Sequence, residues 1–392
     1  MLLGVTLAAL ALVVSGCASD DEPTTAAPES DPSPSASTAT GHADDHPTSI
    51  PDPRPLRAGE QRLTVAMPEP YEPSAPTGVG TDDYRCFLLD PGLEEPAFLT
   101  GTDVRPGTPS VVHHVILFQV PPDQLEAAQQ KDAADAGQGW TCFGGTGLGS
   151  DPGLDDAPWL GAWAPGGRES VLKPGYGVRL EPGSRIIMQV HYNLLAGPEP
   201  DVSAARLRVA PADEDLTPVS TVLLPGPVEL PCRPGHTDNP LCERDAALAD
   251  VKERFGQGPG STADLLHLLC GTPVEPAQEQ SCTRKVPSEM TVLGVAGHMH
   301  LLGKSIEITA RPGTPQEKTL LDIAVWDFDN QGAKPVEPVH LDAGDEVSVT
   351  CRHSQHLRDV LPSFEGQPDR YVLWGEGTTD EMCLGILQVT RP

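Results

Sequence analysis

Three stretches of this sequence carry histidines at spacings that suit a bound metal ion. "GHMHLLGKS" (297–305) places His298 and His300 two positions apart. On a β-strand both imidazoles would project from one side, opposite Val295 and Met299. Two imidazoles on one face can chelate one ion without distorting the backbone. Taken alone, the pair is equally compatible with histidines that only pack, so it marks a candidate site and no more.

The other two stretches are "VVHHVILF" and "IIMQVHYN". His113 and His114 are adjacent, so on a regular strand they point to opposite faces and can share a metal only if the strand bends or ends there. His191 lies with Gln189 on the more polar face of its strand. A lone strand histidine is usually structural, so each signal is ambiguous by itself.

The strands that must position these residues are indicated by short Val/Ile/Leu runs joined by turn dipeptides such as "PG". We therefore predict an all-β chain with two tandem antiparallel β-sandwich (jelly-roll-like) domains, residues 59–200 and 201–392. The second domain carries a cysteine-bearing insert, 232–282, in which "DAALADVKERF" and "STADLLHLLCG" have helical spacing. Trp140, Trp159 and Trp163 are expected to pack in the core or in turns.

The N-terminus predicts an exported protein. Its apolar run is too short to span a bilayer and ends in "VSGC", which resembles the bacterial lipoprotein box. We expect residues 1–17 to be a lipoprotein signal peptide and Cys17 to be lipidated, with an ordinary signal peptide as the alternative. Residues 18–58 are poor in large apolar side chains and should form a disordered tether. The expected location is therefore extracytoplasmic, on the cell membrane of a bacterium.

Charge and cysteine content narrow the partners further. A formal charge of −30 would repel nucleic acid and anionic lipid surfaces, so membrane contact is expected only through the lipid anchor. Eight cysteines remain besides Cys17, and export makes disulfides their default state. The four cysteines of the insert allow three pairings, of which we favour Cys232 with Cys242 and Cys270 with Cys282.

The histidine motifs occur in a recognisable order, followed by "TTDEMCLG". Over roughly residues 60–392 the chain resembles the copper type II, ascorbate-dependent monooxygenases, the family of peptidylglycine α-hydroxylating monooxygenase and dopamine β-monooxygenase. The resemblance implies one mononuclear copper that relays electrons, held by His113, His114 and His191. It implies a second, catalytic copper held by His298, His300 and Met382. A thioether is a soft ligand that favours Cu(I), whereas zinc has little reason to recruit a methionine.

The resemblance also implies the activity and two disulfides. A C–H bond of a small substrate would be hydroxylated with O2, using ascorbate or another small reductant as co-substrate. By the same resemblance Cys86 pairs with Cys142, and Cys351 pairs with Cys383 next to the methionine ligand. Beside the first motifs, Tyr84 and Gln189 are expected to support the ligands or the electron path.

The sequence departs from the peptide-amidating members where they bind the substrate carboxylate. Ala296, Leu384 and Ile386 stand where those members have arginine, asparagine and tyrosine. A buried carboxylate would be left unpaired there, which favours a neutral or hydrophobic substrate. Because these positions have changed, a non-catalytic copper-binding or copper-buffering lipoprotein is the alternative function. His353 and His356 are expected to be surface residues.

Overall fold

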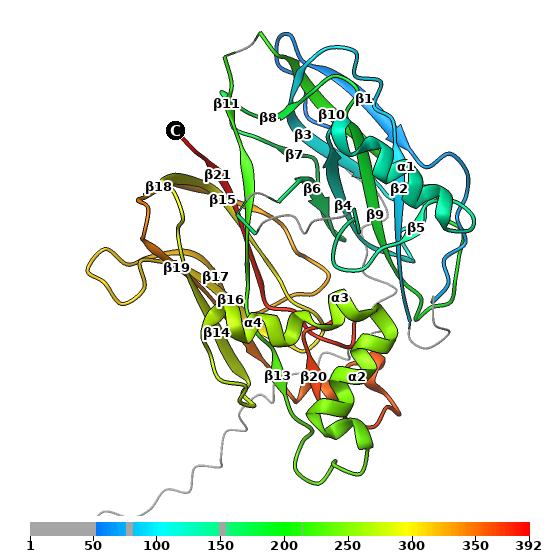
Figure 1. Cartoon of the computed structure of the whole chain (residues 1–392), viewed down its shortest axis with the longest axis vertical. Coiled ribbons are helices and arrows are strands. Elements are labelled where there is room, and N and C mark those ends of the chain that lie inside the picture. The colour runs from blue at the N-terminus through cyan, green and yellow to red at the C-terminus, as the bar shows by residue number, and fades with distance from the viewer. Residues whose placement is uncertain (1–51, 76–80, 149–153, 156, 214) are drawn as a thin grey trace, which may run out of the picture. The chain divides into compact units, whose positions relative to one another are not determined.

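The computed structural model describes residues 52–75, 81–148, 154–155, 157–213 and 215–392. These residues belong to one compact unit, Gly41–Pro392. The expected lipidation site Cys17 and most of the tether lie outside the described residues. Within the described part of the chain, no helix is both long enough and apolar enough to cross a membrane. The fold is mostly β, as predicted (Figure 1).

The first half of the chain forms two facing sheets. The six-stranded sheet contains β1 (Gln61–Ala66), β10 (Ala204–Pro211), β3 (Ala97–Arg105), β8 (Tyr176–Leu180), β11 (Thr217–Pro218) and β7 (Ser170–Val171). The five-stranded sheet contains β5 (Trp140–Thr141), β2 (Asp82–Leu89), β9 (Arg185–Asn193), β4 (Val112–Val120) and β6 (Trp159–Trp163). Leu99 and Leu207 of one sheet share a buried core with Leu117 and Met188 of the other. One 3-10 turn, Pro122–Gln124, and helix α1 (Leu125–Ala134) follow β4.

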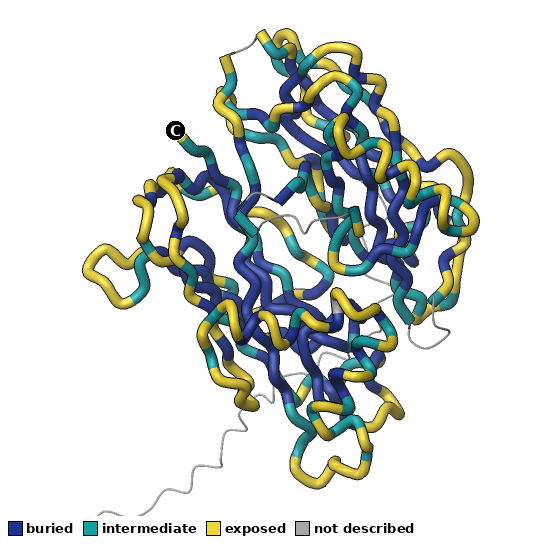
Figure 2. The backbone as a smooth tube through the Cα atoms, viewed as in Figure 1, coloured by how far each residue is buried: buried dark blue, intermediate teal, exposed yellow. Residues whose placement is uncertain are grey.

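The second half forms a second pair of sheets. One contains β12 (Ser220–Pro225), β21 (Leu384–Thr390), β15 (Met290–His298) and β18 (Lys334–Leu341). The other contains β14 (Glu279–Lys285), β19 (Glu346–His353), β16 (Gly303–Ala310) and β17 (Lys318–Ile323). Val292 and Leu387 of the first of these sheets pack against Ile308 and Val349 of the second in a shared core. Figure 2 shows buried strands in both halves of the chain. A short pair, β13 (Glu229–Leu230) and β20 (Val372–Leu373), completes the strands, with α5 (Leu357–Val360) and a 3-10 turn at Pro362–Phe364 before β20.

The insert is helical where the spacing predicted helices. After a 3-10 turn at Pro240–Cys242 come α2 (Arg244–Phe255), α3 (Gln257–Gly260) and α4 (Thr262–Cys270). Helix α4 ends at Cys270 and is capped by Gly271, whose left-handed conformation suits a residue without a Cβ atom.

The boundary between the sandwiches lies later than residue 200. β10 pairs with β1 and β3, and β11 pairs with β8, so strands of the first sandwich continue to Pro218. The stretch "GPEPDVSA" at 197–204 does have turn composition, but the turn connects β9 to β10, which lie in the two sheets of one sandwich. Turn composition indicates a loop and does not distinguish a loop within a domain from a linker between domains.

Four disulfides form with the expected partners, namely Cys86–Cys142, Cys232–Cys242, Cys270–Cys282 and Cys351–Cys383. Cys351 lies in β19 and Cys383 directly precedes β21, so the last bridge joins the two sheets of the second sandwich. Structural disulfides persist in oxidising compartments, and four of them indicate an extracytoplasmic location.

Candidate metal centre

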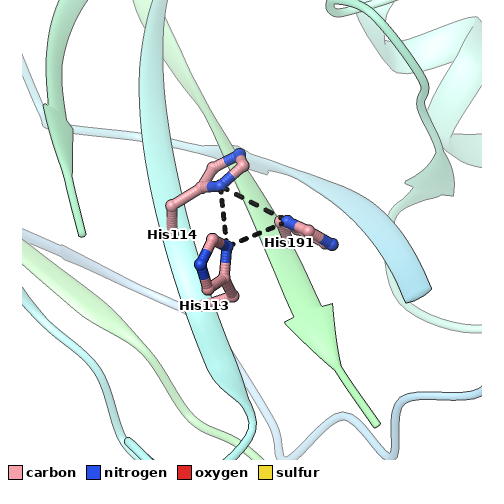
Figure 3. A group of neighbouring side chains, drawn as sticks. All are labelled: His113, His114 and His191. Atoms are coloured by element: carbon pink, nitrogen blue, oxygen red, sulfur yellow. Dashed lines mark hydrogen bonds between the residues drawn. The ribbon is translucent and has the colours of Figure 1, made fainter. Parts of the chain in front are cut away.

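Three histidine side chains converge between neighbouring strands of the first sandwich (Figure 3). The Nδ1 atom of His113 is 3.2 Å from that of His114 and 3.3 Å from that of His191. The third side of the triangle, between His114 and His191, is 3.3 Å. The structure thus brings together all three residues predicted for the first copper.

A β-bulge lets adjacent histidines share this site. His114 pairs directly with His191 across β4 and β9, while Val112 pairs with Tyr192, so His113 is an extra residue in β4. An extra residue kinks its strand and re-aims its side chain. The bend that the two adjacent histidines required is therefore present at His113.

The nitrogen triangle suits a cation better than hydrogen bonding. A ring nitrogen that carries a proton has no lone pair left to accept with, so three mutual contacts cannot all be hydrogen bonds. With sides of 3.2 to 3.3 Å, the centre of the triangle lies about 1.9 Å from each Nδ1 atom. Imidazole nitrogens bind first-row metals at about 2.0 to 2.1 Å. The donor set therefore fits one transition-metal ion.

Neighbouring groups orient the imidazole of His191. Its Nε2–H donates to Oδ1 of Asp82 at 2.8 Å, which leaves Nδ1 as the lone-pair atom facing the other histidines. Although burial opposes it, hydrogen bonds from His191 and Thr378 lower the pKa of Asp82, so its carboxylate is ionised at neutral pH. The ring of Tyr84 stacks on His191 at a centroid distance of 4.0 Å, and Phe328 stacks on His113 at 4.1 Å.

The second predicted ligand set begins where β15 ends. His298 and His300 have ring centroids 5.1 Å apart. Nδ1 of His298 donates to Oε1 of Gln331 at 2.6 Å, so its Nε2 lone pair is free to bind a ligand. Both ring nitrogens of His300 are buried and have no hydrogen-bond partner among the described residues. An imidazole buried without a partner is costly unless something binds it, and a metal ion would do so.

One buried carboxylate connects these histidines to Met382. Oε2 of Glu381 accepts the backbone N–H groups of His300, at 3.1 Å, and of Met382, at 3.2 Å. Its other oxygen accepts the N–H of Leu302. The disulfide at Cys383 fixes the next residue along the chain. Glu381 therefore holds the backbones of an imidazole and a thioether ligand in fixed relation, which preorganises the set.

The two ligand sets adjoin each other. The rings of His114 and His298 are 5.7 Å apart between centroids. Asp82 of the first sandwich accepts hydrogen bonds from both the backbone N–H and the hydroxyl of Thr378. The hydroxyl of Tyr84 donates to the backbone oxygen of Glu376 at 2.9 Å. These contacts bring the loop that carries the methionine against the first histidine cluster.

Burial keeps the central imidazoles uncharged. Burial and the neighbouring histidines lower the pKa of His114 well below its usual value and that of His298 to about 3. Burial also lowers the pKa of His300. Neutral imidazole is the form that binds metals, so these side chains are ready to act as ligands at physiological pH.

His114, His298 and Met382 also line a cavity of about 500 Å³ whose remaining walls are largely apolar. The positions that depart from the peptide-amidating pattern, Ala296, Leu384 and Ile386, all lie on its wall. Trp159 and Trp163, which we expected to serve only for packing, line it as well. A volume in this range is typical of sites for small organic molecules.

Among the described residues, one carboxyl group lines this cavity, that of Glu376. Glu376 is 5% exposed, and burial raises its pKa to about 7, with the charge of Asp380 adding to the effect. Burial would raise the pKa of Asp380 too, but ion pairs with Arg254 and Arg370 lower it instead. The neighbouring carboxyls therefore differ: Asp380 is ionised, while Glu376 is protonated below about pH 7.

Sequence reasoning missed several supporting residues. Asp82, Glu381 and Gln331 contact ligands only through the tertiary fold, although the acidic residues flanking "YRC" and "MCLG" were visible signals. His353 is 2% exposed, with Nε2 3.4 Å from Glu381, so predicting it to be a surface residue was wrong. It ends strand β19 and lies on the face where Val347, Val349 and Cys351 are buried in the core. The side chain of His356 is 74% exposed, as predicted.

No family model and no curated protein matches this sequence. Among solved structures, an allantoicase is similar at 12% identity and a TM-score of 0.18, covering 81% of this chain and 90% of that one. A fucolectin from striped bass (Morone saxatilis) serum is similar at 7% identity and a TM-score of 0.19, covering 85% and 97%. Scores this low carry no argument about function, which therefore has to be argued from the site.

Proposed function

We propose that this protein is a copper-dependent monooxygenase that hydroxylates a C–H bond of a small substrate, using O2 and ascorbate or another small reductant. The observation that carries the proposal is that His114 of the nitrogen triangle, His298 of the second histidine pair and Met382 line one cavity. Five imidazoles and one thioether are a donor set that suits copper in both oxidation states. A set that includes methionine disfavours a hydrolytic zinc enzyme.

Bound copper would supply one-electron chemistry and the activation of O2. The chain's own part is to hold the ligands and exclude bulk water. Asp82 and Gln331 fix which nitrogen of His191 and of His298 faces inward. The overall reaction takes up two electrons from the reductant and two protons, and the second oxygen atom leaves as water. Glu376 is a protonated carboxyl on the cavity wall below about pH 7 and can give a proton there.

The cellular setting is part of the same proposal. Four disulfides place the folded region outside the cytoplasm. Lipidation of Cys17 would then tether it to the outer face of the cell membrane through the segment that precedes the fold. Mass spectrometry of the membrane fraction checks this: we expect a mature N-terminus at Cys17 with attached acyl chains. A mature chain that begins elsewhere and lacks lipid would leave an exported enzyme without an anchor.

Metal analysis and oxygen uptake test the function. The purified protein should bind two copper ions, and oxygen consumption with ascorbate should rise when a substrate from a panel of amines, peptides and apolar compounds is added. Met382→Ala should lose the copper of the second site and the substrate-dependent uptake while keeping the first copper. His356→Ala alters an exposed histidine and should keep both.

The outcomes separate the alternatives. Two coppers without substrate-dependent oxygen uptake would identify the copper-binding or copper-buffering lipoprotein instead. Zinc in place of copper, or full activity in Met382→Ala, would refute the proposed enzyme.

A further inference from the structure

The cavity beside the histidines is built for an apolar guest. Its walls come from both sandwiches and include Phe118, Trp159 and Val178 from the first and Val295, Leu384 and Ile386 from the second. Its volume is about 500 Å³. Aromatic and aliphatic walls of this extent bind by removing apolar surface from water, and that gain requires an apolar ligand.

The rim of the cavity is apolar too. Thr262, Leu265, Leu266 and Leu269 of α4 line it, and this spacing is that of one helix face. Leu265 is 55% exposed and Leu269 is 40% exposed, so both lie where the cavity meets solvent. Exposed leucines at an opening favour entry of a molecule that can cover them. Leu268, 80% exposed, lies on the same helix but does not line the cavity.

The charges at the cavity exclude ionic guests. None of the described residues that line it is a lysine, an arginine or an aspartate. In the metal-free protein an anionic ligand would be buried without a cationic partner among these residues, and above about pH 7 the ionised Glu376 would repel it. The raised pKa of Glu376, about 7 because of burial, shows that this environment disfavours charge even on the protein's own carboxyl. Tyr84, Gln189 and Gln388 provide polar atoms for hydrogen bonds to an uncharged group.

From these features we infer that the cavity binds an uncharged, mainly apolar molecule with one hydrogen-bonding group, and that the molecule enters past Leu265 and Leu269 of α4. The claim that this molecule is the substrate rests on the proposed function, whereas the claim that the cavity binds it does not. The class includes alkyl alcohols and similar neutral lipid-like compounds. It excludes carboxylates and phosphates.

Displacement of the neutral dye N-phenyl-1-naphthylamine from the full chain, with and without bound copper, tests the inference. Trp159, Trp163 and Trp374 line the cavity, so dye binding is read by energy transfer from tryptophan. We expect 1-decanol to displace the dye at concentrations about a hundredfold lower than decanoate, since burying an unpaired carboxylate is costly.

Variants of α4 locate the entrance. Leu265→Gln and Leu269→Gln should weaken dye binding about tenfold each, the scale of losing roughly half the burial of a leucine. Leu268→Gln is the matched control and should bind like the parent. Equal or better displacement by decanoate, absence of dye binding, or equal loss in Leu268→Gln would overturn the inference. Selective dye binding without oxygen uptake would overturn only the proposal that the protein is an enzyme. Turnover of polar substrates without dye binding would overturn only the inference about the cavity.

Discussion

Replacing Asp82 by asparagine tests how the first histidine cluster is prepared for metal. Oδ1 of Asp82 accepts from Nε2 of His191 at 2.8 Å and also from the backbone and hydroxyl of Thr378. Asparagine keeps the size and can keep one acceptor oxygen, so the change removes mainly the negative charge. Carboxylates that hold a metal-binding histidine typically contribute 10- to 100-fold to affinity, which is about 1.4 to 2.7 kcal/mol.

We therefore expect Asp82→Asn to weaken copper binding at His113, His114 and His191 by about 10- to 100-fold. Titration against a chromophoric chelator measures this, with the second site removed by Met382→Ala in every protein compared.

The neighbouring carboxylate is the matched control. Asp83 is more deeply buried than Asp82, at 1% exposed, and its Oδ2 accepts from the hydroxyl of Tyr71 and the backbone N–H of Ser74 instead of from a histidine. Asp83→Asn should leave the copper affinity unchanged even if it lowers the stability of the fold. Unchanged affinity in Asp82→Asn, or an equal loss in both variants, would refute the reasoning that Asp82 prepares His191.

Two further predictions concern stability. Burial raises the pKa of Glu376 from 4.5 to about 7, so between these values the folded state holds a proton that the unfolded state has lost, and stability falls as pH rises. Glu376→Gln should remove this loss. The free energy of unfolding of the variant, measured in denaturant and compared with that of the parent, should therefore increase between pH 4.5 and 8, by at most about 3 kcal/mol. A constant difference across that range would contradict the raised pKa. Replacing both Cys351 and Cys383, which are separated by 32 residues, with alanine should cost about 3 to 4 kcal/mol in urea unfolding and weaken copper binding at Met382. Unchanged copper affinity at Met382 would show that the bridge does not position this ligand.

The order of motifs and the strand periodicity were sufficient for much of the fold and for the three histidines that converge in the first sandwich. Residues two positions apart on a strand point to the same face, so Ala296 and His298 were predicted to share a face, and both line the cavity. Cysteine parity together with export predicted that disulfides form. The pairings of Cys86 and Cys351 came from the family resemblance, and Cys232–Cys242 was the pairing favoured among three. These rules work because they depend on local geometry and on the compartment, not on distant contacts.

The local pattern could not fix what depends on pairing between distant strands. Whether His113 and His114 could share a metal depended on a bulge, which exists only in the register of β4 against β9. The domain boundary was misplaced because turns within a sandwich and linkers between sandwiches have the same amino-acid composition.

The amino-acid sequence by itself determined which side chains are available for metal binding, and on which strands they lie. Only the tertiary structure decided that Asp82 contacts both His191 and Thr378, residues far apart in the chain. It also decided that Glu381 holds His300 next to Met382, and that apolar walls from two sandwiches enclose one cavity. The physical reason is that hydrogen bonding and burial act on distances in space, which a linear pattern does not contain until the chain has folded.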